Sequence, residues 1–153
     1  MTEIDDFAMQ DFLPYLLNRA AEDSSLEFQI FYKGRYGMLR TEWRVLFHLG
    51  MYDRMTAREI STRAKIHKTK ISRAVAKLAE RRWVSRSRDE ADRRSEHLEL
   101  TPAGRHVYED LRDHAKAYDA KLISAFSQAE VALLRGMLRR LANMEAAVKS
   151  DGL

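Results

Sequence analysis

Basic and hydroxyl side chains gather on the stretch from Lys68 to Arg81, and their types and spacing suit nucleic-acid binding. Ile71, Val75 and Leu78 recur there at helical spacing, which predicts an amphipathic helix whose apolar stripe packs inward. The other faces carry groups that can bind phosphates or base edges: Lys68, Thr69, Lys70, Ser72, Arg73 and Lys77. Basic residues on an exposed helix are often only a solvated surface, so the surrounding chain must decide between the two interpretations.

The positive charge of the chain is local. The sequence has 153 residues and a formal net charge of +4, yet residues 54–105 contain 15 Lys or Arg against 7 Asp or Glu. This segment therefore carries +8 and the remainder of the chain −4. A concentrated positive patch favours phosphate binding with release of counterions, whereas a diffuse excess of charge would bear mainly on solubility.

A second group of charges follows the basic helix. Trp83–Arg88 and Glu96–Leu100 alternate with the period of β-strands, and the charged segment 89–95 between them predicts a hairpin. This hairpin carries Arg86, Arg88, Asp92, Arg93 and Arg94. The segment of high charge thus contains two basic elements in succession.

The elements that position these groups can be predicted from caps and periodicity. A helix is expected from Thr41, as its N-cap, to Met51. Thr56 and Glu59 form a capping box that starts a short helix ending near Ala64, and a tight turn leads into the basic helix. Helix, short helix, basic helix and hairpin follow in the order of a winged helix-turn-helix.

Long helices are predicted on both sides of this lobe. The first runs from Asp11 to about Tyr36, and another begins with Thr101 as N-cap and Pro102 at the first helical position. Ser127-Gln128-Ala129-Glu130 is a second capping box and starts the last helix. Its apolar residues repeat at close to heptad spacing: Val131, Leu134, Leu138, Leu141 and Val148. Such seams would otherwise face water, so the terminal helices are expected to form a homodimer interface.

The expected fold is mainly α-helical with a small β-hairpin wing, a winged helix-turn-helix with an added helical dimerisation region. Residues 1–40 would form the N-terminal helix and part of the dimer interface. Residues 41–101 would form the DNA-binding lobe, and residues 102–153 the C-terminal dimerisation helices. A dimer suits this chemistry, because two recognition helices can reach successive major grooves of a palindromic site.

Composition argues against several other classes. The chain has no Cys, which removes disulfides, thiolate zinc sites and thiol switches. No run of about 18 apolar residues occurs and the N-terminus is acidic, so a cytoplasmic protein without a membrane partner is expected. No Gly-x-Ser-x-Gly, phosphate-cradling glycine loop or Walker motif is visible, so neither an enzyme nor a cofactor is expected.

Two alternatives remain within the same fold. A metal-responsive protein is one, since His106 and His114 lie eight residues apart on one predicted helix face, near Glu109, Asp110 and Asp113. Without Cys or a closely spaced His pair, surface histidines are the simpler interpretation. A winged helix that binds only protein is the other alternative, and the local charge of +8 argues against it.

Four motifs, in order, resemble the MarR (multiple antibiotic resistance regulator) family of winged-helix repressors over essentially the whole chain. They are Thr41-Glu42-Trp43-Arg44-Val45-Leu46, Ile71-Ser72-Arg73 followed by Leu78, Asp92-Arg93-Arg94, and Leu100-Thr101-Pro102-Ala103-Gly104. The chain departs from the family on either side of the basic helix, where glycine is frequent and Lys65 and Arg82 stand here. Glycine adopts a left-handed backbone more easily than either residue.

The resemblance implies a place for each basic group. Thr69, Lys70, Ser72, Arg73 and Lys77 are expected at the major groove, where Arg73 could read a guanine edge with two hydrogen bonds. Arg94 matches the family's wing-tip arginine, expected in the minor groove, and Asp92 would orient or pin it through a charge-assisted pair. Arg86, Arg88 and Arg93 would contact phosphates.

Ligand control is also implied by the resemblance. The family commonly binds small aromatic, often phenolic, anions between the dimer helices and the DNA-binding lobe. Here the cleft would be lined by the N-terminal helix within residues 1–40, the Trp43 helix and the start of the helix after Pro102. The candidates for that cleft are Tyr15, Arg19, Trp43, His48, Tyr52 and Tyr108, which would supply aromatic walls and a cation or hydroxyl for a carboxylate. The expected protein is a homodimeric repressor that binds double-stranded DNA and is released by an aromatic acid or its thioester.

Overall fold

The computed structural model describes residues 6–92 and 94–143, and the chain divides into two compact units, Met1–Ala115 and Lys116–Leu153. The first unit opens with a 3-10 turn (η1, Met9–Asp11) and the helices α1 (Leu13–Tyr36), α2 (Arg40–Tyr52), α3 (Ala57–Ala64) and α4 (Lys68–Glu80). Strands β1 (Met55–Thr56), β2 (Val84–Arg88) and β3 (Glu96–Leu100) and the first part of α5 (Pro102–Ile123) complete it. The second unit contains the rest of α5 and α6 (Gln128–Ala142).

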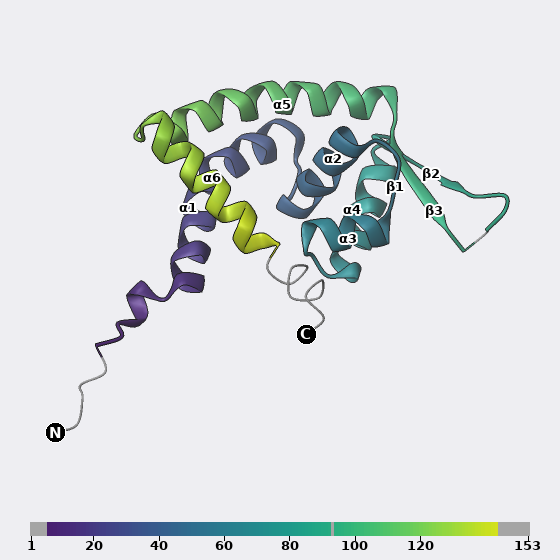
Figure 1. The fold of residues 1–153 in the computed structure, drawn as a ribbon. Helices are drawn as coiled ribbons and strands as arrows, with labels where there is room; N and C mark the ends of the chain where they lie inside the picture. The colour runs from purple at the N-terminus through teal and green to yellow at the C-terminus, as the bar shows by residue number, and fades with distance from the viewer. Residues whose placement is uncertain (1–5, 93, 144–153) are drawn as a thin grey trace. The chain divides into compact units, whose positions relative to one another are not determined.

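The three strands form one antiparallel sheet in the order β1-β3-β2. Val84 lies opposite Leu100 and Arg88 opposite Glu96, so β2 and β3 pair along their whole length. In Figure 1 this hairpin projects beyond helices α2, α3 and α4 as a wing. The two-residue strand β1, which the sequence analysis missed, pairs with β3 through Met55 and Leu98 and thereby joins the start of α3 to the wing.

The core of the first unit holds the basic helix in place. Leu46 and Leu49 of α2, Ile60 of α3, Leu98 of β3 and Leu111 of α5 have no exposed surface. The stripe predicted on α4 meets them, because Ile71 and Leu78 are also fully buried and Val75 nearly so. Burial of three apolar side chains at helical spacing fixes which face of α4 points outward.

Most of the predicted helix starts are confirmed. The Thr56 hydroxyl accepts a hydrogen bond from the Glu59 N–H at 3.1 Å, and that of Thr101 accepts one from the Gly104 N–H at 3.0 Å. Ser127 and Glu130 form the full reciprocal capping box, with bonds of 3.1 and 2.9 Å. These caps satisfy backbone donors that the first turn of a helix leaves without partners.

Two predicted helix starts are wrong. Helix α2 begins at Arg40 with Leu39 as its N-cap, not at Thr41. The reason lies at Glu42, whose buried carboxylate accepts the Leu39 N–H at 3.0 Å and so caps the helix from within its first turn. Helix α1 begins at Leu13 rather than Asp11, because residues 9–11 form a separate 3-10 turn.

The fold class is confirmed as mainly α-helical with a small sheet. The predicted division into residues 1–40, 41–101 and 102–153 assigns a functional role to each segment, whereas the two compact units are defined by contacts. That division therefore stays a prediction. Val148, the last residue of the predicted α6 seam, lies outside the described residues. Across residues 6–92 and 94–143, no helix is both long enough and apolar enough to cross a bilayer.

Candidate nucleic-acid interface

Helix α4 presents the groups that the sequence analysis placed on its outer faces. While its apolar stripe is buried, all six predicted side chains are exposed: Lys68, Thr69, Lys70, Ser72, Arg73 and Lys77. The start of the helix is fixed by His67, whose Nδ1 accepts the Thr69 N–H at 3.1 Å. The exposed face of α4 therefore combines four cations with two hydroxyls on a rigid support.

The turns at both ends of α4 have left-handed backbones without glycine. Lys65 has a φ of 56° and Arg82 a φ of 62°. The first turn is held by Ser61, whose hydroxyl donates to the Ile66 carbonyl at 2.6 Å. The second is held by Thr101, whose hydroxyl donates to the Arg82 carbonyl at 2.6 Å. These positions keep the geometry that the resemblance implied, at the cost of strain that glycine would not have.

The wing tip is organised by Asp92, in a way that corrects one expectation. One carboxylate oxygen of Asp92 accepts the backbone N–H of Arg94 at 3.0 Å, and the other accepts the Ser95 hydroxyl at 3.2 Å. The predicted pair with the Arg94 guanidinium is therefore replaced by a turn contact to its backbone, which positions Arg94 while its side chain stays exposed.

The other wing arginines differ in their surroundings. Arg86 forms an ion pair with Glu96 at 2.7 Å, so a phosphate would have to compete with that carboxylate. Arg88 is exposed on β2, and Arg93 lies outside the described residues. Among the predicted wing contacts, Arg86, Arg88, Asp92 and Arg94 are exposed.

The six predicted ligand-cleft residues do not gather in one place. Tyr15 and Arg19 are exposed on α1, with the guanidinium 5.8 Å from the ring centroid. His48 and Tyr108 are buried in the core, where the Cβ of any residue replacing Gly50 would lie 2.4 Å from the Tyr108 ring. The ring of Tyr52 lies 4.3 Å from the Arg63 guanidinium. Only Trp43 of this set lines the cavity described next.

A cavity of about 310 Å³ lies between α1 and α2, and we name it the α1–α2 cavity. Half of its lining residues are aromatic, and the lining is Ala21, Ser25, Phe28, Tyr32, Arg40, Trp43, Arg44 and Phe47. The sequence analysis missed seven of these eight residues. The signal was present, because Phe28 and Tyr32 on one helix, and Arg40 and Arg44 on the next, are spaced four residues apart and so share a face.

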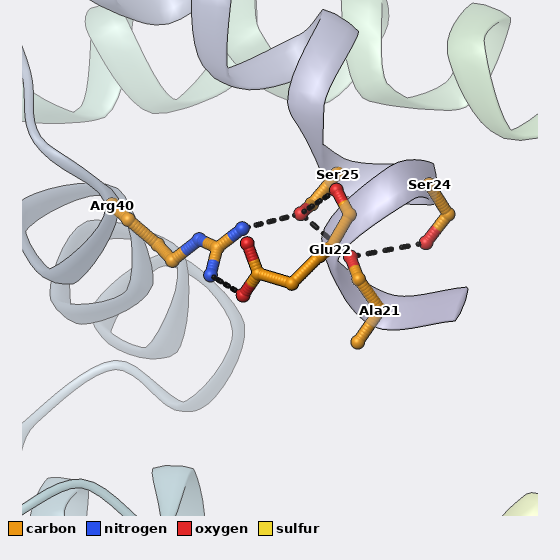
Figure 2. Close-up of polar contacts among 5 residues, drawn as sticks. All are labelled: Ala21, Glu22, Ser24, Ser25 and Arg40. Atoms are coloured by element: carbon orange, nitrogen blue, oxygen red, sulfur yellow. Dashed lines mark hydrogen bonds and ion pairs between the residues drawn. The ribbon is translucent and has the colours of Figure 1, made fainter. Parts of the chain in front are cut away.

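The two arginines of this cavity are held differently. Figure 2 shows Arg40 reaching from α2 to α1, where it contacts the Glu22 carboxylate at 2.8 Å and the Ser25 hydroxyl at 2.5 Å. The hydrogen bond from Arg40 lowers the pKa of Glu22. Arg44 donates instead to the Ala64 carbonyl at 2.9 Å, and burial lowers its pKa. Arg44 is thus a partly desolvated cation that pairs with a backbone dipole rather than a carboxylate.

His106 and His114, the histidines of the metal alternative, do not belong to a cluster of possible metal ligands among the described residues. His114 stacks on Phe31 with ring centroids 4.3 Å apart, and its Nδ1 lies 2.9 Å from the Asp110 carbonyl oxygen. His106 is exposed. Within the described part of the chain, no group of three or more potential His, Asp or Glu ligands comes together around a possible metal position.

An exposed basic helix, capped and buried along one side, and a basic hairpin on the same unit define a winged helix-turn-helix DNA-binding protein. A model of the MarR family matches residues 36–95, which include α2 to α4 and most of the wing. Over this segment the chain matches the MarR family, whose members are DNA-binding transcriptional regulators rather than enzymes.

Comparisons with individual proteins agree with this assignment. Two HTH-type transcriptional regulators of Bacillus subtilis are similar, YwaE at 23% identity over 83% of this chain and 74% of its own, and YwoH at 26% over 60% and 66%. A MarR/EmrR family regulator from Acinetobacter sp. ADP1 superposes with a TM-score of 0.81 at 26% identity, covering 96% of this chain and 100% of its own. BpsR of Bordetella bronchiseptica, whose DNA binding is regulated by 6-hydroxynicotinic acid, superposes with a TM-score of 0.79 at 21% identity, covering 90% and 97%.

Proposed function

We propose that this regulator is a homodimeric, cytoplasmic repressor that binds a palindromic operator in double-stranded DNA and is released by a small aromatic anion. The observation that carries the DNA part is the exposed face of α4, where four cations and two hydroxyls stand above a buried apolar stripe. Arg73 would read a guanine edge, and the lysines would hold phosphates or base edges. Arg94 at the wing tip would enter the adjacent minor groove, while Arg86, Arg88 and Arg93 would contact phosphates.

A second copy of the chain is the proposed partner of the exposed apolar side chains. Phe12, Leu13 and Leu16 are exposed around the start of α1 in the first unit. Leu134 and Leu138 are exposed on α6 in the second unit, as the predicted seam requires. Each unit thus has apolar surface that dimerisation would remove from water, and large patches of this kind usually mark interfaces.

The α1–α2 cavity is the proposed effector site. Its four aromatic side chains suit a flat ring, and Arg40 and Arg44 suit a carboxylate or phenolate at the ring's edge. This site replaces the six-residue cleft expected from the sequence, of which it retains only Trp43. The regulation of the similar protein BpsR by 6-hydroxynicotinic acid, a small aromatic acid, supports an effector of that class.

Release of DNA requires that the effector bind one state of the dimer more tightly than the other. An anion beside Arg40 would compete with Glu22, one of the two α1 residues that Arg40 of α2 contacts. Loss of the Arg40–Glu22 ion pair would change how α1 holds α2 and the lobe that contains α2. A dimer geometry in which the two α4 helices no longer match successive major grooves would then be favoured.

Footprinting on the DNA flanking the gene for this regulator tests the operator and the dimer together. Two protected half-sites with centres about 10 base pairs apart, or a multiple of that spacing, are expected from a two-fold dimer. Sedimentation equilibrium at the same protein concentration should give twice the mass of one chain. A single unpaired half-site, or a monomer in solution, would contradict the dimeric reading.

Quenching of tryptophan fluorescence tests the effector site, because Trp43 lines it. Benzoate and 6-hydroxynicotinate should quench, whereas benzamide, which has the ring without the charge, should quench much less. Trp43→Phe should remove the signal, and Arg40→Gln and Arg44→Gln should each weaken binding of the acids. Equal quenching by benzamide and benzoate, or unchanged affinity in both arginine variants, would rule out the proposed site.

A further inference from the structure

The basic surface of α4 continues into a second cavity. The DNA contacts predicted on α4 and on the wing leave the role of this cavity open. This α2–α4 cavity, about 320 Å³ in volume, lies between the start of α2 and the turn that joins α3 to α4. Its lining includes Arg40, Thr41, Arg44, Lys65, His67 and Lys70. Among its lining residues, all of which the structure describes, four are Lys or Arg and none is acidic.

The cations around this cavity come from two sides, from α2 and from the α3–α4 turn. Arg40 pairs with Glu22 on α1, and Arg44 donates to the Ala64 carbonyl. Lys65 and Lys70 are exposed and approach the cavity from the α3–α4 side. Four positive charges lining one cavity repel one another, so an anion placed there would be stabilised by all of them.

Lys65 is the most informative of these residues, because its backbone is unfavourable for its side chain. It ends α3 with a φ of 56°, a left-handed conformation in which a Cβ is strained and glycine is not. The geometry is imposed locally, since the Ile66 N–H and carbonyl are both bonded to Ser61, at 3.2 and 2.6 Å. A lysine at such a position brings a charge to the cavity where a glycine would make an easier turn.

We propose that the α2–α4 cavity binds a phosphodiester group of the DNA backbone and that the Lys65 ammonium is one of its ligands. This inference rests on the proposed DNA binding through α4. It adds a contact outside both the helix face and the wing, next to the end of α4 that approaches the bases in helix-turn-helix complexes. A phosphate there would fix the depth and register of the helix while carrying no sequence information.

Arg82 supplies a matched control. It is also a cation with a left-handed backbone, at a φ of 62°, and it also stands next to α4. It follows the C-terminal end of the helix, however, and the 13 residues of α4 separate the two ends by about 20 Å. Lys65→Gly and Arg82→Gly therefore remove the same charge and relieve the same kind of strain, and only the first should affect DNA.

The experiment measures operator affinity at several salt concentrations, together with thermal unfolding, for the wild type and both variants. Lys65→Gly should weaken operator and scrambled DNA by the same factor, about eightfold at 0.1 M salt, and reduce the slope of log K against log salt by about 0.9. Arg82→Gly should leave affinity and slope unchanged. Both variants should unfold at or above the wild-type temperature, because glycine relieves the strained turn.

Several results would overturn the inference. Wild-type affinity and slope in Lys65→Gly would show that the cavity holds no DNA phosphate, as would an equal loss in Arg82→Gly. A lower unfolding temperature for Lys65→Gly would assign its side chain a structural role instead. If the wild type bound no DNA at all, the proposed function would fail first, which is a different outcome from wild-type binding that Lys65→Gly leaves intact.

Inorganic phosphate distinguishes the DNA backbone from a free anion. Adding phosphate in exchange for chloride at constant ionic strength should have little effect on the unfolding temperature, since one dianion lacks the neighbouring contacts of a docked duplex. A rise in the wild type that Lys65→Gly abolishes, with DNA affinity and salt slope unchanged in that variant, would make the cavity a site for a small anion and contradict the proposal.

Discussion

Replacing Gly104 by alanine should separate the wing from the helix that supports it. Gly104 lies in the first turn of α5, and a Cβ at this position would stand 1.9 Å from the Trp83 carbonyl oxygen and 2.7 Å from its carbon. That carbonyl is held by the Thr101 N–H at 2.9 Å, and Trp83 in turn donates to Leu78 at 3.0 Å. The start of β2 and the start of α5 must therefore move apart.

The expected loss of stability follows from the kind of atom that the new methyl group meets. Overpacking costs about 1–3 kcal/mol when side chains can adjust, and here backbone must move, so we expect at least about 3 kcal/mol. The higher helix propensity of alanine offsets about 1 kcal/mol, which leaves a net loss of about 2 kcal/mol or more. Gly34→Ala in α1 is the control, because its Cβ would meet nothing within 4 Å. It should gain about 1 kcal/mol.

Urea unfolding of both variants and the wild type, at one protomer concentration, measures these differences directly. DNA affinity of the folded Gly104→Ala protein should also fall, since the wing would be displaced from α4. A Gly104→Ala protein as stable as Gly34→Ala would refute the reasoning, because the close approach of α5 to Trp83 would then not exist in solution.

Arg94→Ala should lower DNA affinity and reduce the salt slope by about one unit, and full affinity with an unchanged slope would contradict a wing contact. Arg73→Ala should lose about 1–3 kcal/mol of discrimination at one base position, measured on single-substitution operators, whereas a uniform loss on all sequences would make Arg73 a phosphate contact. Burial lowers the pKa of His48, with the charges of Arg44 and Arg63 acting in the same direction. The unfolded chain then binds a proton that the folded chain resists, so stability should be full above the unfolded pKa of about 6.5 and fall as the pH drops below it. Urea unfolding between pH 5 and 8 should show this slope in the wild type and a flatter profile in His48→Gln, and identical profiles would contradict the assignment.

Local patterns were sufficient to predict the DNA-binding elements. The stripe of Ile71, Val75 and Leu78 determined the buried face of α4, and the outer face followed from it. The caps at Thr56, Thr101 and Ser127 were predictable because each depends on atoms only three residues away.

Features that depend on tertiary contacts were not predicted. The short strand β1 exists because Met55 pairs with Leu98, more than forty residues later. Thr41 lost its expected capping role because the Glu42 carboxylate is buried against the Leu39 N–H. The α1–α2 cavity was not predicted because its walls come from two helices whose crossing the sequence does not specify, although each wall shows a pair of like residues four apart.

The sequence marked Lys65 as a departure from glycine, but it did not predict that the turn would keep a left-handed backbone. The family resemblance marked the position as one where glycine is frequent, and the structure shows that the left-handed turn is retained with a lysine in it. A departure from a preferred residue can thus leave the backbone unchanged and alter only the charge next to the recognition helix.

Fluorescence anisotropy of labelled duplexes tests most directly whether the basic lobe binds a specific DNA sequence. The purified protein would be titrated against DNA flanking its own gene and against a scrambled duplex, at two salt concentrations. Affinity for the flanking DNA should exceed that for the control by about 1,000-fold or more and fall steeply with salt. An operator-sized fragment bound no better than the scrambled duplex at either salt concentration would contradict the account.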